Sequence, residues 1–202
     1  MTVKGYAKFE SSVMQRLLQK PVAALGMHWA FQSLFYMDVT ERRFKLVLDA
    51  IGTIAAWLLL RLVLPWQVAV PVAFLLAHTA NLLANGHLWG VLKHYGFVSN
   101  SYEAFERYSQ QLAMRVQVEE SIVYGAIYGS RVRSEWKPSS DLDVRLVRRP
   151  GFVAGVKACW FVLKERSRAT WYRFPLDLYV LDSHAPLAHM RADERPFVIC
   201  ER

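Results

Sequence analysis

Apolar side chains concentrate in two long runs in the first half of the chain, residues 44–64 and 66–85. Each run has about the 20 residues that a helix needs to cross the hydrocarbon core of a bilayer. Pro65 separates the two runs and predicts a break of only a few residues. The pattern therefore predicts a transmembrane helical hairpin with both outer ends on one side. A buried helical pair in a soluble oligomer is the alternative interpretation.

Polar residues interrupt these runs, and five of them bear on the interpretation. Asp49 and Arg61 lie in the first, and His78, Asn81 and Asn85 lie in the second. Arg61 is close enough to a helix end to extend to the membrane surface, whereas Asp49 lies about one turn inside. The three polar residues of the second run fall at helical spacing. We expect them to face the first helix or another subunit.

The segment before the hairpin, residues 1–43, has an interfacial pattern. Apolar residues spaced four apart predict an amphipathic helix over residues 7–18 that is basic on its polar side and ends before Pro21. This helix either lies on an anionic membrane surface or packs on the rest of the protein. Residues 27–39 are rich in aromatic side chains, which are typical of the membrane–water boundary.

Basic residues are distributed unequally between the two ends of the predicted hairpin. The outer ends carry Arg42, Arg43, Lys45, Lys93 and His94, whereas the tip carries only Arg61. Positively charged loops remain on the cytoplasmic side of a membrane. The sequence therefore predicts a multi-pass protein of the cytoplasmic membrane with its termini and C-terminal domain in the cytoplasm.

The second half of the chain alternates between helical and strand patterns. We divide the chain into an N-terminal segment (1–43), a transmembrane hairpin (44–98) and an α+β domain (99–202) with a small mixed sheet. In this domain the pattern predicts helices over 101–120, 130–136 and 152–168, and strands over 121–128, 141–148 and 174–181.

By composition the chain is basic, and its cysteines do not form a recognisable pattern. The 202 residues include 25 Lys and Arg against 17 Asp and Glu, a net charge of +8. This balance suits nucleic acid, anionic lipid or polyphosphate substrates. Cys159 and Cys200 are too few and too far apart to indicate a zinc site or a disulfide framework. Three arginines, Arg145, Arg148 and Arg149, are expected to form a solvated strand edge.

The candidate chemistry lies between the first two predicted strands of the domain. Asp141 and Asp143 are two apart, so on a strand their carboxylates share one face. Such a pair repels unless a cation lies between, and a hard divalent ion with oxygen ligands is the usual partner. Gly129 allows close approach of the backbone to an anion, and Ser130 adds a hydroxyl and an N–H in front of the predicted short helix.

A third carboxylate is needed for transfer through two metal ions, and Asp177 is the best candidate. It lies within an apolar strand, where a carboxylate is costly without a partner. Asp182 is the competitor. It lies at the strand end beside Ser183, so we expect it to have a role in a turn or a helix cap.

These residues resemble the signature of the nucleotidyltransferase superfamily related to DNA polymerase beta, and most closely its minimal nucleotidyltransferase group. The matching features are Gly129-Ser130, then Arg131 and Arg133, then Ser-Asp-Leu-Asp at residues 140–143 before a hydrophobic strand. Ser134 departs from the pattern, which usually has Gly there.

The resemblance implies a mechanism. Asp141, Asp143 and Asp177 hold Mg²⁺ or Mn²⁺ against a nucleoside triphosphate, and Gly129 and Ser130 bind its phosphates. Arg131 and Arg133 add positive charge, although solvated surface positions explain them equally well. The acceptor attacks the α-phosphorus and pyrophosphate leaves.

The sequence therefore predicts an enzyme, a membrane-anchored nucleotidyltransferase acting on an acceptor hydroxyl or phosphate. The hairpin suggests an acceptor that is itself membrane-bound, or a protein partner, and favours a homo-oligomer among membrane lipids. The alternative is a catalytically degenerate subunit that serves a membrane complex as a scaffold or nucleotide sensor. Transfer to nucleic acid ranks last, because the chain has no added RNA-binding module.

Overall fold

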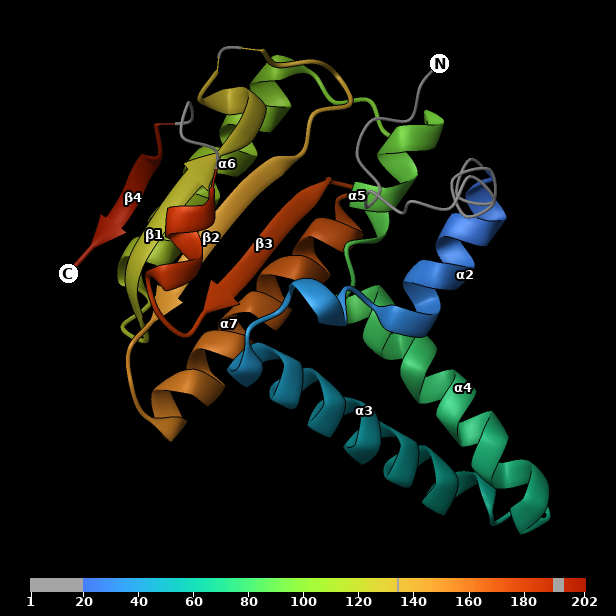
Figure 1. Cartoon of the computed structure of the whole chain (residues 1–202). Coiled ribbons are helices and arrows are strands. Elements are labelled where there is room, and N and C mark those ends of the chain that lie inside the picture. Colours follow the sequence, from blue (N-terminus) through green and yellow to red (C-terminus); the bar gives the residue numbers. More distant parts are fainter. Residues whose placement is uncertain (1–19, 134, 191–194) are drawn as a thin grey trace.

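A four-stranded mixed sheet forms the centre of the C-terminal half (Figure 1). The structure, a computed structural model, describes residues 20–133, 135–190 and 195–202, which contain six α-helices and four strands. The strand order is β3-β2-β1-β4, with β2 and β3 parallel and the other pairs antiparallel. The strands are β1 Ile122–Tyr128, β2 Leu142–Arg148, β3 Leu176–Leu181 and β4 Phe197–Glu201. The predicted α+β class with a small mixed sheet is confirmed.

Helices α6 (Tyr102–Val118) and α7 (Phe152–Trp171) cover one face of this sheet. Tyr108 of α6 stacks on Phe174 with ring centroids 3.9 Å apart, and both join the apolar core beneath β2 and β3. Because side chains alternate along a strand, buried Val144 points into this core and its neighbour Asp143 points to the opposite face. The acids therefore lie on the face that α6 and α7 leave open.

Two antiparallel helices project away from the sheet as an arm (Figure 1). They are α3 (Val39–Leu60) and α4 (Trp66–Asn85), and the second has the predicted bounds. Before them come α2 (Pro21–Phe31) and the 3-10 turn η1 (Leu34–Tyr36), and after them α5 (Leu88–Leu92) and η2 (Lys93–Tyr95). We call α3 and α4 together the hairpin.

Polar side chains of the hairpin face inward, as expected. His78 Nδ1 lies 2.6 Å from Asp49 Oδ2, and His78 Nε2 lies 2.8 Å from the Trp29 carbonyl oxygen. Both imidazole nitrogens thus face oxygens, one of a carboxylate and one of the backbone. Asn81 donates to the Lys45 carbonyl oxygen at 3.3 Å. These contacts hold α2, α3 and α4 together.

A buried ionic network joins the base of the hairpin to α7 and β3. Arg166 of α7 lies 2.5 Å from Glu41 and donates to Asn85 Oδ1 at 2.9 Å. The second oxygen of Glu41 accepts the Val180 N–H at 2.9 Å, and Lys45 donates to the Asn85 carbonyl oxygen at 2.9 Å. Glu41 and Arg166 are 2% and 1% exposed. The hairpin is therefore fixed to the sheet through its charged groups.

Among the described residues, one helix, α4, is long and apolar enough to cross a membrane, with a mean hydropathy of 1.5. The predicted first span fails this criterion, because α3 contains Glu41, Arg42, Arg43, Lys45 and Asp49 in its first three turns. The structure thus gives one candidate span, where the sequence predicted two.

Several local predictions were wrong. The helix expected over 130–136 is only the 3-10 turn η3 (Gly129–Arg131), and Pro138 helps to exclude a longer helix in this short connection. The strand β4 and the 3-10 turn η4 (Ala185–His189) were missed. Pro21 begins a helix that the sequence did not predict, α2, where its missing N–H costs nothing. The helix predicted over 7–18 lies outside the described residues, and the domain divisions at 43 and 98 stay predictions.

Candidate functional site

Two acids and a glycine meet at one end of the sheet. Asp143 and Asp177 are direct neighbours in the register of parallel strands β2 and β3. Gly129 follows β1, which pairs with β2 on its other side, and has a φ of 77°. A Cβ at this glycine would overlap the Asp143 carboxylate. The glycine therefore serves two purposes, since it adopts a left-handed conformation and leaves room for an acid.

Asp141, Asp143 and Asp177, which we call the acid group, do not have equally compensated charges. Burial raises the pKa of Asp143 above its ordinary value, and the negative charges of Asp141 and Asp177 raise it further. Burial also acts to raise the pKa of Asp177, but the Arg145 charge, the neighbouring His87 and hydrogen bonds with Arg145 and Asp143 together hold it below the ordinary value. Three carboxyl groups thus share one small region, and their surroundings favour the protonated form of Asp143, because its charge would be the least compensated.

Two cations partly neutralise the acids. Lys93 of η2 forms an ion pair with Asp141. Arg145 donates to Asp177 Oδ2 at 2.8 Å and to its backbone oxygen at 2.9 Å, and the guanidinium lies 4.9 Å from the centre of the Tyr179 ring. The expectation that Arg145 forms a solvated strand edge is wrong, because its half-buried guanidinium pairs with Asp177.

A buried histidine adjoins Asp177 from the hairpin side. His87 Nε2 lies 3.3 Å from the Leu178 carbonyl oxygen and 3.9 Å from Asp177 Oδ1. Burial, assisted by the Arg166 charge, lowers the pKa of His87 well below its ordinary value, so the ring is neutral at physiological pH. With Nε2 donating to the carbonyl, Nδ1 is a buried acceptor that has no partner in the described part of the chain.

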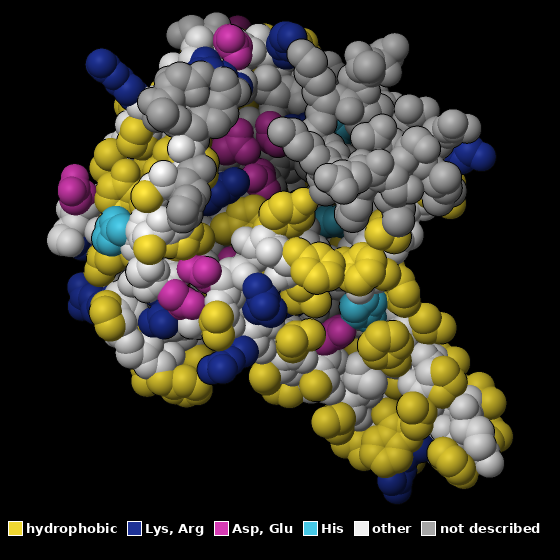
Figure 2. All heavy atoms as spheres, in the orientation of Figure 1, with side chains coloured by type: hydrophobic (Ala, Val, Ile, Leu, Met, Phe, Trp, Pro, Cys, Tyr) yellow, Lys and Arg dark blue, Asp and Glu magenta, His cyan; other side chains and the backbone are white. Residues whose placement is uncertain are grey.

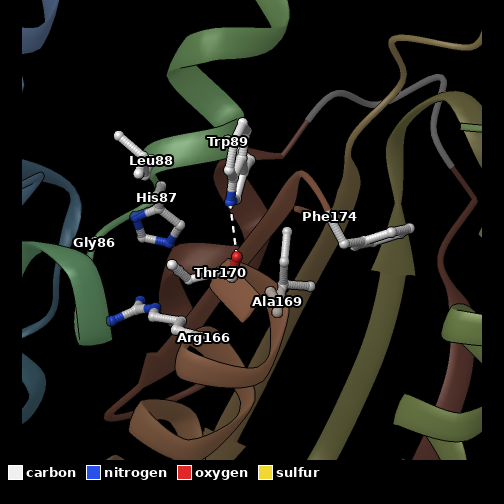
Figure 3. A pocket seen from close by; sticks show the side chains of 9 residues that line it. Gly86, His87, Leu88, Trp89, Arg166, Ala169, Thr170 and Phe174 are labelled. Carbon is white, nitrogen blue, oxygen red and sulfur yellow. Dashed lines mark hydrogen bonds between the residues drawn. The ribbon is translucent and has the colours of Figure 1, made fainter. Parts of the chain in front are cut away.

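Beneath His87 lies a small cavity lined by α5 and α7 (Figure 3). Figure 3 shows His87 above the Arg166 side chain, with the Trp89 indole N–H directed to the Thr170 carbonyl oxygen at 2.9 Å. The cavity has room for about one water molecule. It is therefore too small for a nucleotide.

The residues predicted to bind phosphate differ in whether they already have a partner in the protein. Ser130 Oγ is buried and has no hydrogen-bond partner among the described residues, so its hydrogen-bonding capacity is unused there. Arg131 instead forms a two-bond ion pair with Glu106 at 3.0 and 3.1 Å. Arg133 lies 2.9 Å from Glu135. Around turn η3, the serine hydroxyl could therefore bind a phosphate, whereas both arginines already contact acidic side chains. Ser134 lies outside the described residues.

The donor set fits a hard divalent cation, although the side chains are not arranged around one. In the described part of the chain, no group of three His, Cys, Asp or Glu side chains stands ready to hold a metal ion. Asp141 and Asp177 are instead paired with Lys93 and Arg145. All three acids supply oxygen ligands, and a cation would relieve the uncompensated charge at Asp143.

Asp182, the rejected competitor, has the structural role that was expected. Its carboxylate accepts the Thr40 N–H at 3.1 Å in the first turn of α3 and lies 2.7 Å from Arg148 Nε. It caps that helix and ties it to the end of β2. Asp182 is therefore separate from the acid group at the other end of the strands.

No protein-family model matches the chain, and a search of curated proteins finds no match either. The resemblance to nucleotidyltransferases thus stays a prediction that rests on the motif at residues 129–143.

Sequence reasoning missed three residues that lie against the acid group: Arg145, Lys93 and His87. A signal existed for Arg145, because strand alternation puts it on the same face as Asp143. For Lys93 and His87 there was none, since both come from the segment that follows the hairpin.

Proposed function

We propose that the protein is a membrane-anchored nucleotidyltransferase, which transfers a nucleoside monophosphate from a triphosphate to an acceptor hydroxyl or phosphate. The observation that carries the proposal is the side-by-side register of Asp143 and Asp177 with Gly129 packed against Asp143. Convergent carboxylates next to a close backbone approach suit a metal–triphosphate complex. The paired cations and the free Ser130 hydroxyl provide additional contacts for phosphate.

Each residue has a role in this scheme. Asp141, Asp143 and Asp177 would hold Mg²⁺ or Mn²⁺, which would offset the charge of the triphosphate. The backbone of Gly129 and the hydroxyl of Ser130 bind its terminal phosphates. Asp177 orients or deprotonates the acceptor hydroxyl. The acceptor oxygen bonds to the α-phosphorus as the bond to the β-phosphate oxygen breaks, and pyrophosphate leaves.

The position of the acid group favours an acceptor at the membrane. His87 is the second residue after α4 and lies 3.9 Å from Asp177. The proposed reaction centre therefore adjoins the base of the hairpin. A lipid-linked or head-group acceptor, or a protein bound beside the hairpin, would meet the acids there.

Insertion of the hairpin into a bilayer is part of this proposal. Three of the five charged residues of α3 turn inward: Glu41 and Lys45 are each 2% exposed, and Asp49 contacts His78. The other two, Arg42 and Arg43, are exposed in its first turns. Its other outward side chains are apolar and exposed, including Leu46, Val47, Ile51, Ile54, Leu58 and Leu59. Hydrophobic side chains cover most of the arm in Figure 2. Such a surface is typical of contact with lipid and rare in contact with water.

The proposed orientation predicts which cysteines a membrane-impermeant maleimide reaches in intact cells. Val63 at the tip is 78% exposed, and both native cysteines are buried. A Val63→Cys variant should react from outside, because the tip crosses the membrane, whereas Met114→Cys on α6 should react only after lysis. Equal labelling of the two variants in intact cells would contradict the orientation.

The activity itself is tested by incubating the purified chain in detergent with each labelled nucleoside triphosphate and Mg²⁺ or Mn²⁺. We expect pyrophosphate release with at least one nucleotide and its loss in Asp141→Ala and Asp143→Ala. Unchanged release in both variants would defeat the enzymatic proposal.

One observation favours a second candidate, a degenerate subunit that acts as a scaffold or nucleotide sensor. Lys93 and Arg145 already occupy two of the three acids, as in a site that has replaced a metal by fixed cations. The apolar hairpin would then assemble with other subunits or with further copies of this chain. Absence of any metal-dependent nucleotide binding would favour this candidate.

A further inference from the structure

The outer face of α7 carries exposed apolar side chains over the first turns of the helix and again at its last residue. Phe152, Val153, Val156, Trp160 and Trp171 are 87%, 65%, 40%, 51% and 85% exposed. At about 100° per residue, these five positions fall within about 100° of the helix circumference. A helix on the surface of a protein normally has polar side chains on such a face. We call these five residues the outer face of α7.

The charges beside this face have one sign. Lys157 and Lys164 are exposed and lie along its edge, within about 140° of Phe152. The sequence of α7 contains a single acid, Glu165, which is 1% exposed and bonded to Arg115 at 2.8–2.9 Å. An apolar face edged by lysines, with tryptophan on it, is typical of a helix that lies in the head-group region of an anionic membrane.

The outer face continues from the base of the hairpin. Figure 1 shows α7 crossing that base at a steep angle, and Gly155 of α7 packs against Thr40 in the first turn of α3. Hydrophobic side chains also gather at the lower left of Figure 2, where Figure 1 shows the start of α7. A helix at a steep angle to a membrane-crossing hairpin lies near the membrane plane.

We infer that the outer face of α7 binds the surface of an anionic lipid bilayer, with its aromatic and valine side chains among the acyl chains and its lysines at the lipid phosphates. This second contact would hold the domain in one orientation about the hairpin. The inference rests on the membrane-anchoring part of the proposed function, and independently of it on the composition of this face.

The test uses an environment-sensitive fluorophore at single introduced cysteines. The native thiols leave this labelling selective, because both are buried and burial raises the pKa of Cys159 to about 12. The chain, labelled at Val156→Cys, Leu59→Cys or Met114→Cys, is placed in nanodiscs of phosphatidylcholine with or without phosphatidylglycerol. Residue 59 reports on the hairpin, and residue 114 on an exposed surface of α6.

We expect blue-shifted emission and a several-fold decrease in iodide quenching at residues 59 and 156, but not at 114. The change at 156 should be larger with phosphatidylglycerol and should decrease in Lys157→Glu/Lys164→Glu, while the signal at 59 stays constant. Protection at 59 with a water-exposed 156 would overturn the inference and leave the anchor intact. Protection of 156 in detergent that increases with protein concentration would also overturn it, since it would assign the face to a second copy of the chain.

Discussion

Replacing Arg166 by Met should lower the free energy of unfolding by about 3–5 kcal/mol, because it leaves the buried Glu41 carboxylate without its cation. Asn85 Oδ1 and the Leu178 carbonyl oxygen also lose a donor. The measurement is unfolding by denaturant in detergent. The double variant Glu41→Gln/Arg166→Met should recover part of the loss, since the uncompensated charge is gone.

Arg168→Met is the matched control two residues along the same helix. Its side chain is 41% exposed, and its partner Glu165 keeps the ion pair with Arg115. We expect a change below about 1 kcal/mol. If Arg166→Met is no more destabilising than Arg168→Met, the network does not fix the hairpin to the sheet.

Gly129→Ala should reduce nucleotidyl transfer by at least about a hundredfold, because the new Cβ displaces the Asp143 carboxylate from its place against the turn. The backbone strain of a φ of 77° adds to this effect. The measurement is the initial rate of pyrophosphate release at saturating nucleotide.

Gly96→Ala separates strain from displacement. Gly96 has a φ of 80°, close to that of Gly129, but nothing lies within 4 Å of an added Cβ. We expect it to lose some stability while keeping the transfer rate near that of the parent chain. Equal rates for the two variants would show that the close approach of Gly129 to Asp143 has no part in the reaction.

The strands could be predicted from the sequence because their signals are local. Apolar runs flanked by turn residues gave β1, β2 and β3 to within two residues of their observed ends, and alternation put Asp141 and Asp143 on one face. The register that aligns Asp143 with Asp177 has no local signal. It depends on the length of the α7 crossover and on how that helix packs.

The contacts that surround the acids could not be predicted for a similar reason. Arg166 and Glu41 are 125 residues apart in the sequence, and helix α6 separates Lys93 from its partner Asp141. Treating the hairpin and the C-terminal domain as separate units hid both pairs. The mean hydropathy of α3 does not reveal its apolar outer side, because the mean counts every residue whatever the direction of its side chain. The inward charges of Glu41, Lys45 and Asp49 lower this mean.

The central claim is that Asp141, Asp143 and Asp177 bind a divalent cation together with a nucleoside triphosphate. Electron paramagnetic resonance of free Mn²⁺, titrated with the protein and a non-hydrolysable triphosphate analogue, measures this most directly. The account predicts nucleotide-dependent Mn²⁺ binding that weakens by more than about tenfold in Asp143→Asn and Asp177→Asn, and is unchanged in the exposed-acid control Glu120→Gln. Equal Mn²⁺ binding by all four proteins, or none by any of them, would contradict it.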